Sequence, residues 1–173
     1  MLYLLDASAI LNNPRFTFDE KHRYACTLEI LEELKSFETK TLAENALKRK
    51  LLRVYRPKHK YWKNAEKIVS QKGFTRMSRA DISVIALAMQ FKEEGKEFVV
   101  LTDDYSIQNF LAMLGIAFSP IIQGRIKQTI AFIKYCPACL REFHKACAPR
   151  ECPDCGIELK TKRVVEKVGK GVS

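Results

Sequence analysis

Short apolar runs alternate with longer segments of helical periodicity through the first two thirds of the chain. Runs of three or four apolar residues are typical of strands buried on both faces. They occupy residues 2–5, 24–26, 98–101 and 116–118. The segments between them predict helices at residues 28–36, 41–55, 61–71, 82–91 and 105–114. Strands that alternate with helices indicate βαβ units, so we expect a parallel sheet flanked by helices over residues 1–118.

Polar residues with capping spacing precede three of the predicted helices. Thr27 is a candidate N-cap for the first helix. Thr41 and Glu44 have the spacing of a capping box, as do Ser78 and Asp81. These signals predict that the second helix begins near Thr41 and the fourth near Ser78.

A change in composition after residue 118 predicts a second, smaller unit. Residues 119–131 contain a proline and a glycine and are expected to be a linker. Residues 132–163 hold five of the six cysteines and are expected to form a small ribbon. Residues 164–173 are expected to be a basic tail. The predicted organisation is therefore an α/β domain at residues 1–118 followed by these three segments.

The chain carries a strong excess of positive charge, with 30 Lys and Arg against 20 Asp and Glu and a formal net charge of +10. A field of this sign attracts polyanions, so nucleic acid is the leading candidate partner. No apolar run approaches the roughly 18 residues that a bilayer requires. The first apolar run stops at Asp6 and lacks a basic leader, so we expect no signal peptide and a cytoplasmic protein.

Two Cys-x-x-Cys units lie twelve residues apart in the predicted ribbon. Their four cysteines are Cys136, Cys139, Cys152 and Cys155. Each turn directs two thiolates at one point, and two turns complete the tetrahedron of a closed zinc site. About thirty residues cannot fold by burial alone, so a structural Zn²⁺ would supply the folding free energy. A disulfide pair or an iron site is the alternative, and His144 or Cys147 could replace one ligand.

Acidic residues follow the predicted strands where an open α/β sheet binds its ligands. Asp6 ends the first strand, and Asp103 and Asp104 follow the strand at residues 98–101. Ligands of such sheets bind beyond the carboxyl ends of the strands, and Asp81 at a helix start can face the same crevice. Crowded acids are costly unless a divalent cation neutralises them. We therefore expect Mg²⁺ or Mn²⁺ there, able to activate water for attack on a phosphodiester.

One further acid is placed beside this crevice by its helical angle. At about 100° per residue, Glu33 lies roughly 70° from the centre of the apolar face of its helix, whereas Glu32 points nearly opposite. We expect Glu33 to flank the crevice and Glu32 to lie in water.

Each of these acids also has a purely structural alternative. Asp103 or Asp104 can cap the helix that follows, and Asp81 can complete the capping box with Ser78. Glu33 can be one more solvated helix acid. The joint pattern of the acids, rather than any single residue, favours a metal site.

Four acidic segments resemble the signatures of PIN-domain nucleases. They are residues 4–8 (Leu-Leu-Asp-Ala-Ser), 32–34 (Glu-Glu-Leu), 79–87 (Arg-Ala-Asp-Ile-Ser-Val-Ile-Ala-Leu) and 101–109 (Leu-Thr-Asp-Asp-Tyr-Ser-Ile-Gln-Asn). The last segment, followed by a four-cysteine ribbon, is similar to the Nin-one-binding proteins, endonucleases that mature the 3′ end of small-subunit rRNA. The resemblance covers about residues 1–160 and is to the archaeal type, which lacks a long insertion.

This resemblance implies a Rossmann-like PIN fold whose acidic cluster binds Mn²⁺ or Mg²⁺. Asp6, Glu33 and Asp81 match the first three acids of the family by position. The fourth acid falls in the Asp103–Asp104 pair, where the Thr-x-Asp pattern of the family favours Asp104 and leaves Asp103 as a further candidate ligand. The resemblance also implies cleavage products with 3′-hydroxyl and 5′-phosphate ends.

Two other positions bear on the resemblance. Ser8 matches the small hydroxyl residue that accompanies the first acid of the family. Leu140 follows the first cysteine hairpin where Gly156 follows the second, so we expect the first turn to be less regular.

Eight basic residues and no acid occur between Asn45 and Lys63, with aromatic residues among them. Cations beside aromatic rings are typical of surfaces that bind single-stranded RNA. The alternative is a solvated helix face whose aromatic rings lie in the core. The predicted ribbon carries further basic residues. The candidate RNA-binding residues are Lys48, Arg49, Lys50, Arg53, Arg56, Lys58, Lys60, Trp62, Arg141 and Lys145.

We therefore expect a metal-dependent endoribonuclease that cleaves pre-rRNA at the 3′ end of 16S-type rRNA, with the small ribosomal subunit precursor as its partner. The catalytic acids would be Asp6, Glu33, Asp81 and Asp104. One alternative is an RNA-binding assembly adaptor without catalysis. Another is a different PIN ribonuclease, such as a toxin.

Overall fold

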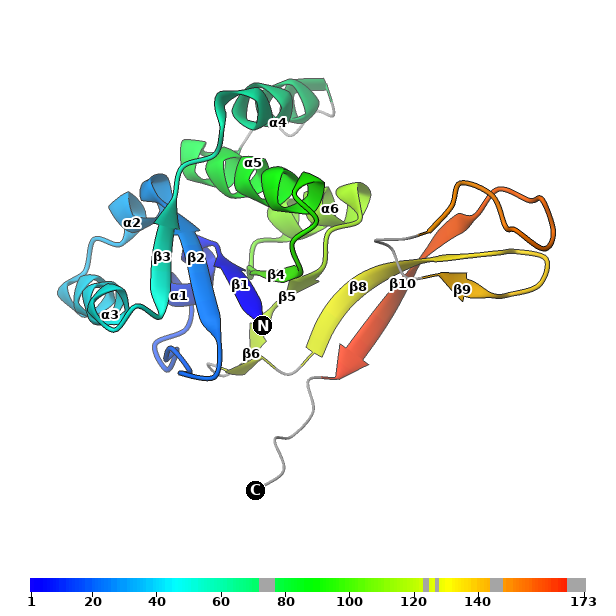
Figure 1. The fold of residues 1–173 in the computed structure, drawn as a ribbon. Coiled ribbons are helices and arrows are strands. Elements are labelled where there is room, and N and C mark those ends of the chain that lie inside the picture. Colours follow the sequence, from blue (N-terminus) through cyan, green and yellow to red (C-terminus); the bar gives the residue numbers. More distant parts are fainter. Residues whose placement is uncertain (72–76, 123–124, 127, 144–147, 168–173) are drawn as a thin grey trace.

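A computed structural model describes residues 1–71, 77–122, 125–126, 128–143 and 148–167. Figure 1 shows a helical body with a long two-stranded arm. In chain order the elements are β1 (Leu2–Leu5), α1 (Ala7–Leu11), β2 (Arg23–Thr27), α2 (Leu28–Glu33), α3 (Phe37–Lys48), β3 (Leu52–Tyr55), α4 (His59–Gln71), α5 (Arg79–Glu93), β4 (Phe98–Leu101), α6 (Tyr105–Leu114), β5 (Phe118–Ser119), β6 (Ile121–Ile122), β7 (Arg125–Ile126), β8 (Gln128–Tyr135), β9 (Glu142–Phe143) and β10 (Lys160–Lys167).

The main sheet has the strand order β10-β8-β5-β4-β1-β2-β3, and β9 pairs with β8. The five strands from β5 to β3 are parallel to one another, whereas β8 pairs antiparallel with β5 and β10 pairs antiparallel with β8. The predicted parallel sheet flanked by helices is confirmed. Because β1 lies between β4 and β2, the residues that follow these three strands meet at one edge of the sheet.

Helix α5 forms the centre of the body. It packs on β1 and β2 on one side and on α4 on the other, so its residues are buried almost all round. Val84 and Leu87 belong to the core over the sheet, whereas Ile85 and Phe110 belong to a second core beneath α4. Figure 1 shows α4 as an outer layer above α5. The first turn of α5, which contains Asp81, is thereby held near the carboxyl ends of the parallel strands.

The helix expected at residues 41–55 is a wrong prediction. Helix α3 begins earlier, because Ser36 Oγ accepts the backbone N–H of Thr39 at 3.2 Å as an N-cap. It ends in a Schellman turn, in which Lys50 takes a left-handed φ of 57° and Leu51 N donates to the carbonyl of Ala46. The following residues form β3, which pairs with β2 at the edge of the sheet.

Smaller differences affect two other elements. Helix α2 ends at Glu33 rather than at residue 36, and β5 covers residues 118–119 rather than 116–118. The helix ends expected at Ser78 and Gly115 are confirmed, the first by a complete capping box and the second by a left-handed φ of 59°. Gly73, expected to end α4, lies outside the described residues.

The segment expected as a linker contains strands. Within residues 119–131 lie the β6–β7 pair and the first part of β8. Strand β8 is attached to the body through Phe118 of β5, which pairs with Ile130. It then pairs with β10 along its whole length. The division of the chain into separate domains stays a prediction.

The arm formed by β8 and β10 carries the cysteines at its far end (Figure 1). Cys136 and Cys152 are buried there together with Leu159 in a small core of their own. The predicted ribbon is confirmed as a cysteine-centred unit. Among the described residues, no helix is long and apolar enough to cross a membrane.

Candidate active site and metal centre

Asp6 is a buried carboxylate at the end of β1, with 2% of its surface exposed. Its Oδ2 accepts two hydroxyl bonds, from Ser8 Oγ at 2.5 Å and from Thr102 Oγ1 at 2.8 Å. Asp6 occupies the N-cap position of α1, yet its side chain makes no capping bond. The carboxylate is therefore held in place by hydroxyls and is not used to begin the helix.

Asp81 lies in the first turn of α5 and Glu33 is the last residue of α2. Asp81 Oδ2 accepts the backbone N–H of Ser78 at 2.7 Å, which completes the capping box. Ser78 Oγ also donates to Glu33 Oε1 at 3.5 Å, a long bond that links the two helices. Glu33 is half-buried and Glu32 is exposed, as their helical angles predicted.

A buried pair of hydroxyls sets the position of α5 against α2. Ser83 Oγ donates to the carbonyl of Ala80 at 2.6 Å, so its contact of 2.6 Å with Thr27 Oγ1 uses the Thr27 hydrogen. Thr27 is also the N-cap of α2 and accepts the backbone N–H of Ile30. One threonine thus fixes both the start of the helix that carries Glu33 and the helix that carries Asp81.

The two adjacent acids after β4 have different surroundings. Asp103 Oδ2 accepts a bond from Asn13 Nδ2 at 2.7 Å, and its Oδ1 accepts the backbone N–H of Ile121 at 2.8 Å. Asp104 Oδ1 caps α6 by accepting the backbone N–H groups of Ser106 and Ile107. Both oxygens of Asp103 are therefore used to hold neighbouring segments, whereas the capping bonds of Asp104 involve one oxygen.

Four acids influence one another electrostatically. Burial raises the pKa of Asp6, and the charge of Asp81 raises it further against the opposing hydroxyl bonds. Burial, followed by the charges of Asp81 and Asp6, raises the pKa of Glu33. Burial and the charge of Asp104 raise the pKa of Asp81, while bonds from Ser78 lower it. Asp6, Glu33, Asp81 and Asp104 thus form one cluster of like charges.

The charges of this cluster are only partly offset by basic side chains, since the charge of Lys35 lowers the pKa of Glu33. Within the part of the chain that the structure describes, no ion pair involves any of the four acids. Like charges held together in this way favour binding of a cation with oxygen ligands. The residue types of the cluster fit a divalent cation. Among the described residues, however, the group whose ligand atoms are gathered closely enough to hold a metal ion is that of the four cysteines.

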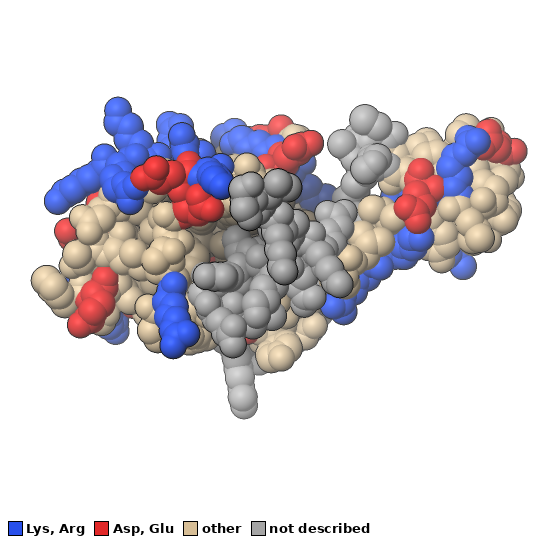
Figure 2. Space-filling model, turned by 90° about the horizontal axis from the view of Figure 1, so that it is seen from below, with Lys and Arg blue, Asp and Glu red and all other residues tan. Residues whose placement is uncertain are grey.

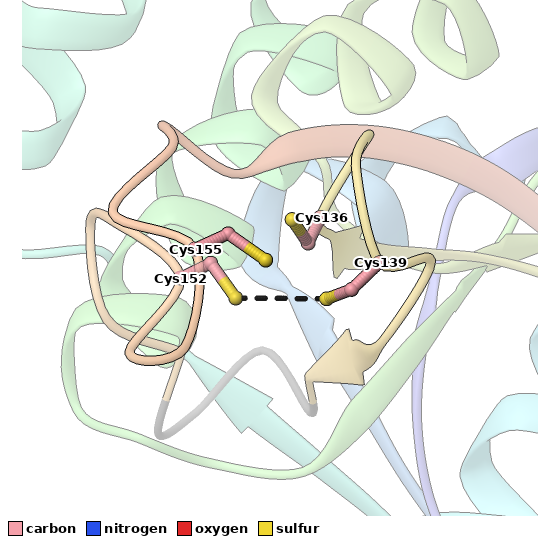
Figure 3. A group of neighbouring side chains, drawn as sticks. All are labelled: Cys136, Cys139, Cys152 and Cys155. Atoms are coloured by element: carbon pink, nitrogen blue, oxygen red, sulfur yellow. Dashed lines mark hydrogen bonds between the residues drawn. The ribbon is translucent and has the colours of Figure 1, made fainter.

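The four predicted cysteines converge from two loops at the end of the arm (Figure 3). Their sulfur atoms all lie within 4.8 Å of one another, and Cys139 Sγ is 3.7 Å from Cys152 Sγ. Four sulfur atoms at about 2.3 Å from one ion lie about 3.8 Å apart at the corners of a tetrahedron. The thiols therefore have the spacing of a tetrahedral metal site. His144 and Cys147 lie outside the described residues.

Backbone groups favour ionised sulfur in this cluster. The N–H groups of Cys139 and Ala138 lower the pKa of Cys136 to about 7. Hydrogen bonds that the Cys155 thiol donates to the neighbouring sulfur atoms, with Cys139 first, favour its protonated form and raise the pKa of Cys155 to about 12. Four thiols cannot all ionise side by side without a positive charge, so this cluster fits a cation as well.

The two cysteine turns are alike, contrary to the irregular first turn that Leu140 suggested. Leu140 N donates to the carbonyl of Cys136 at 2.9 Å, and Gly156 N donates to that of Cys152 at 2.8 Å. Leu140 has a φ of 59° and Gly156 a φ of 67°. Leucine thus adopts the left-handed conformation that glycine adopts without cost in the second turn.

Most of the candidate RNA-binding residues lie on α3, β3, α4 and the loops beside them, and Arg141 lies on the arm directly before β9. Arg49, Lys58, Lys60 and Arg141 form exposed ion pairs with Glu20, Glu94, Glu93 and Asp154 respectively. Such pairs contribute little to stability, so these cations are available to other anions. Figure 2 shows basic side chains along one edge of the body and along the arm, interleaved with acids.

Other members of this set have no carboxylate partner in the described part of the chain. They are Lys48, Lys50, Arg53 and Arg56. Lys50 and Arg53 line one pocket together with Arg23 and Tyr55. The pocket lies at the amino ends of β1 and β2, away from the acids. Lys145 lies outside the described residues.

Trp62 is partly buried in α4 and is not a freely exposed ring. Its Nε1 donates to Glu66 Oε1 at 2.7 Å, and the guanidinium of Arg79 lies 5.5 Å from the centre of the ring. Arg79 is the first residue of α5, two positions before Asp81. The tryptophan therefore holds a cation near the acid cluster, which the sequence analysis did not anticipate.

Two polar residues that hold the acids were also not assigned a role from the sequence. The sequence does contain a signal for the role of Thr102, because this residue directly precedes the acid pair in the Leu-Thr-Asp-Asp segment. Asn13 gives no local signal, since its partner Asp103 lies 90 residues further along the chain.

The chain matches a family described as the PIN domain of ribonuclease over residues 3–91. It is 33% identical to Endoribonuclease Nob1 of Methanothermobacter thermautotrophicus over 94% of both chains. This chain belongs to the PIN-domain ribonuclease family. Endoribonuclease Nob1 of Methanocaldococcus jannaschii is also 33% identical, over 96% of this chain and 80% of that relative. Ribonuclease VapC1 of Thermoplasma acidophilum is 29% identical, over 92% of this chain and 77% of that relative.

Proposed function

We propose that this PIN-domain protein is a metal-dependent endoribonuclease of ribosome biogenesis that cuts pre-rRNA at the 3′ end of 16S-type rRNA. The observation that carries the catalytic part is the cluster of Asp6, Glu33, Asp81 and Asp104, in which neighbouring negative charges raise the pKa of Asp6, Glu33 and Asp81. No ion pair involves any of the four acids in the described part of the chain. The substrate rests on the likeness to relatives named Endoribonuclease Nob1 over nearly the whole chain. We include the cytoplasmic location expected from the sequence in this proposal.

The four acids would hold Mn²⁺ or Mg²⁺, with Asp104 rather than Asp103 as the ligand from the end of β4. Asp103 uses both oxygens to fix Asn13 and Ile121, and it is therefore assigned a positioning role. A bound divalent cation supplies positive charge for the phosphodiester and lowers the pKa of the attacking water. Attack at phosphorus breaks the bond to the 3′ oxygen, leaving a 3′-hydroxyl on one fragment and a 5′-phosphate on the other.

The hydroxyls around Asp6 keep its carboxylate ready for this task. Ser8 Oγ accepts the backbone N–H of Asp103 at 2.9 Å while it donates to Asp6. Its hydrogen is therefore directed at the carboxylate. Hydrogen bonds of this kind favour the ionised form and oppose the effect of burial. These bonds therefore favour the ionised carboxylate that a cation would bind.

The cysteine cluster would hold a structural Zn²⁺. Four thiols in tetrahedral spacing leave no position for a substrate, which is typical of zinc sites that stabilise a fold. Metal analysis of the purified chain should give about one zinc per molecule. Cys152→Ser should remove it and increase hydrogen exchange in β9 and around the cysteines, while β1, β4 and α5 keep their protection. Loss of protection throughout the chain would contradict an independent ribbon.

Basic residues on the body and the arm would bind the RNA on either side of the cut. Lys48, Lys50, Arg53 and Arg56 are the strongest candidates, because they have no carboxylate partner among the described residues. The pocket at Lys50 and Arg53 lies away from the acids, so it would contact RNA at a distance from the cut. Charge reversal there should weaken binding to all RNA sequences alike.

The experiment that tests this function uses end-labelled RNA that spans the 3′ boundary of 16S-type rRNA. The protein is incubated with this RNA in Mn²⁺ or in EDTA, and an unrelated RNA serves as control. One Mn²⁺-dependent cut at the mature end supports both the chemistry and the substrate. Metal-dependent cuts scattered over both RNAs would reject the substrate and favour another PIN ribonuclease. RNA binding without any cut would favour the assembly adaptor.

A further inference from the structure

Two aromatic side chains near the acid cluster lie almost entirely in solvent. Phe37 and Tyr105 each expose 80% of their surface, more than any other large hydrophobic residue in the described part of the chain. Single exposed hydrophobic residues are common and need no functional explanation by themselves. What distinguishes these two is their position, because each is the first residue of a helix that follows a candidate catalytic acid.

The two rings come from opposite sides of Asp6. Tyr105 directly follows Asp104 at the end of β4, and Phe37 lies four residues after Glu33, in the connection that follows β2. Strand β1, which ends at Asp6, lies between β4 and β2 in the sheet. Four residues of chain span at most about 14 Å. Tyr105 therefore adjoins Asp104 in the chain on the β4 side of Asp6, and the backbone of Phe37 lies within about 14 Å of that of Glu33 on the β2 side.

Helix geometry directs each of the two side chains toward the start of its own helix. The Cα–Cβ bonds of a helix tilt toward its N-terminus, so a residue of the first turn leans past the start of the helix. The starts of α3 and α6 are stabilised by other groups, namely Ser36 Oγ and Asp104 Oδ1. Neither ring takes part in an aromatic or cation–π contact within the described residues. The fold therefore does not use these rings.

We propose that Phe37 and Tyr105 each stack on an RNA base, one on each side of the phosphodiester that the acids cut. This inference rests on the proposed function and adds a determinant of the substrate. Aromatic rings stack on any unpaired base, because every base has a π-face. A duplex keeps its bases stacked inside, so the two rings select single-stranded RNA at the cut. The acids then act on a phosphate held between two fixed bases.

The test measures binding of a labelled single-stranded RNA of twelve nucleotides in EDTA, where no cleavage occurs. Phe37→Ala and Tyr105→Ala should each weaken binding roughly 5- to 150-fold, the range found for loss of one stacked base. Phe37→Tyr and Tyr105→Phe keep the ring and should bind within about twofold of the parent. Met113→Ala removes another exposed apolar side chain of α6 and should have no effect.

A second measurement uses the parent chain alone and does not depend on the folding of any variant. RNA that carries abasic sugars on both sides of the cut loses both stacking contacts, so the parent should bind it more weakly than either alanine variant binds intact RNA. With abasic RNA, each alanine variant should bind almost as tightly as the parent binds the same RNA. Equal binding of intact and abasic RNA would overturn the stacking.

The two proposals fail in different ways. If the parent cuts RNA in Mn²⁺ while both alanine variants bind and cut as it does, the stacking is wrong and the nuclease stands. If the parent binds no single-stranded RNA and cuts none, the proposed function is wrong, and this inference is wrong with it.

Discussion

The hydroxyl of Thr102 donates a hydrogen bond to Asp6 Oδ2 at 2.8 Å, across 96 positions of the sequence. The hydroxyl oxygen of Thr102 also accepts the backbone N–H of Asp104 at 3.1 Å. Thr102 has no exposed surface. A single buried threonine at the end of β4 therefore orients the central carboxylate and the segment that carries the neighbouring acid.

Replacing this hydroxyl should disturb both acids. Thr102→Val keeps the shape of the side chain but leaves the backbone N–H of Asp104 without its acceptor and removes one donor from Asp6. We expect a loss of about 1–3 kcal/mol in the free energy of unfolding, together with slower cleavage. Thr102→Ser keeps the hydroxyl and is the control. Urea unfolding and initial cleavage rates measure the two effects, and a valine variant equal to the parent in both would contradict the role of Thr102.

The neighbouring acids Glu32 and Glu33 provide a matched pair. Glu33 faces Ser78 and the acid cluster, whereas Glu32 is exposed. Glu33→Gln should slow Mn²⁺-dependent cleavage at least roughly 100-fold, because metal-ion stabilisation of the reacting charge is worth several kcal/mol. Glu32→Gln should cut like the parent. Both variants should unfold cooperatively on heating, which shows that they are folded. Equal cleavage rates would show that Glu33 does not belong to the site.

The raised pKa values predict how stability depends on pH without metal. An acid with a raised pKa in the folded state binds more protons folded than unfolded, between its ordinary pKa and its raised one. The contributions of Asp6, Glu33 and Asp81 to stability are therefore largest at low pH and are lost as the pH rises through that window. Above the window, the ionised cluster destabilises the fold.

Asp6→Asn should relieve this repulsion. In EDTA at pH 7 the variant should be more stable than the parent by roughly 0.5–2 kcal/mol, since removing a strained functional group commonly stabilises a protein. The difference should shrink as the pH falls through this window, because Asp6 of the parent then becomes neutral too. Unfolding curves in EDTA at several pH values measure it. A variant less stable than the parent at pH 7 would show that Asp6 stabilises the fold instead.

The left-handed turns of the ribbon give a prediction about metal affinity. Left-handed backbone costs a residue with a side chain roughly 1 kcal/mol, and Asn tolerates it better than Leu. Leu140→Asn should therefore strengthen metal binding by up to about fivefold, because binding and folding of the ribbon are coupled. Gly156→Ala should weaken it by a similar factor, although its Cβ meets no atom within 4 Å. Competition with a chromophoric chelator measures both, and an unchanged affinity would contradict the coupling.

Much of the body could be predicted because its signals are local. Short apolar runs predicted β1 and β4, and Ser78 with Asp81 marked the start of α5. The end of α3 was missed because Lys50, rather than a glycine, adopts the left-handed position of its Schellman turn. Strand β3 then pairs with β2, and such pairing overrides the helical pattern of the sequence.

The site could be predicted only in part, because local signals mark the acids but not the contacts that hold them. The acids lie at strand and helix ends that the sequence marks, and Glu33 was distinguished from Glu32 by its helical angle. The contacts that hold them join distant segments, such as Asn13 to Asp103 and Thr102 to Asp6. No local pattern encodes these bonds. The capping roles foreseen for Asp81 and Asp104 occur as well, so structural and catalytic roles do not exclude each other in these residues.

The most direct test of the account compares the parent with Asp6→Asn in one cleavage assay. Both proteins are incubated with end-labelled RNA across the 3′ boundary of 16S-type rRNA in Mn²⁺, and RNA affinity is measured in parallel in EDTA. We expect the parent to cut once at the mature end and the variant to bind the RNA equally well without cutting it. Normal cleavage by Asp6→Asn would contradict catalysis by the acid cluster.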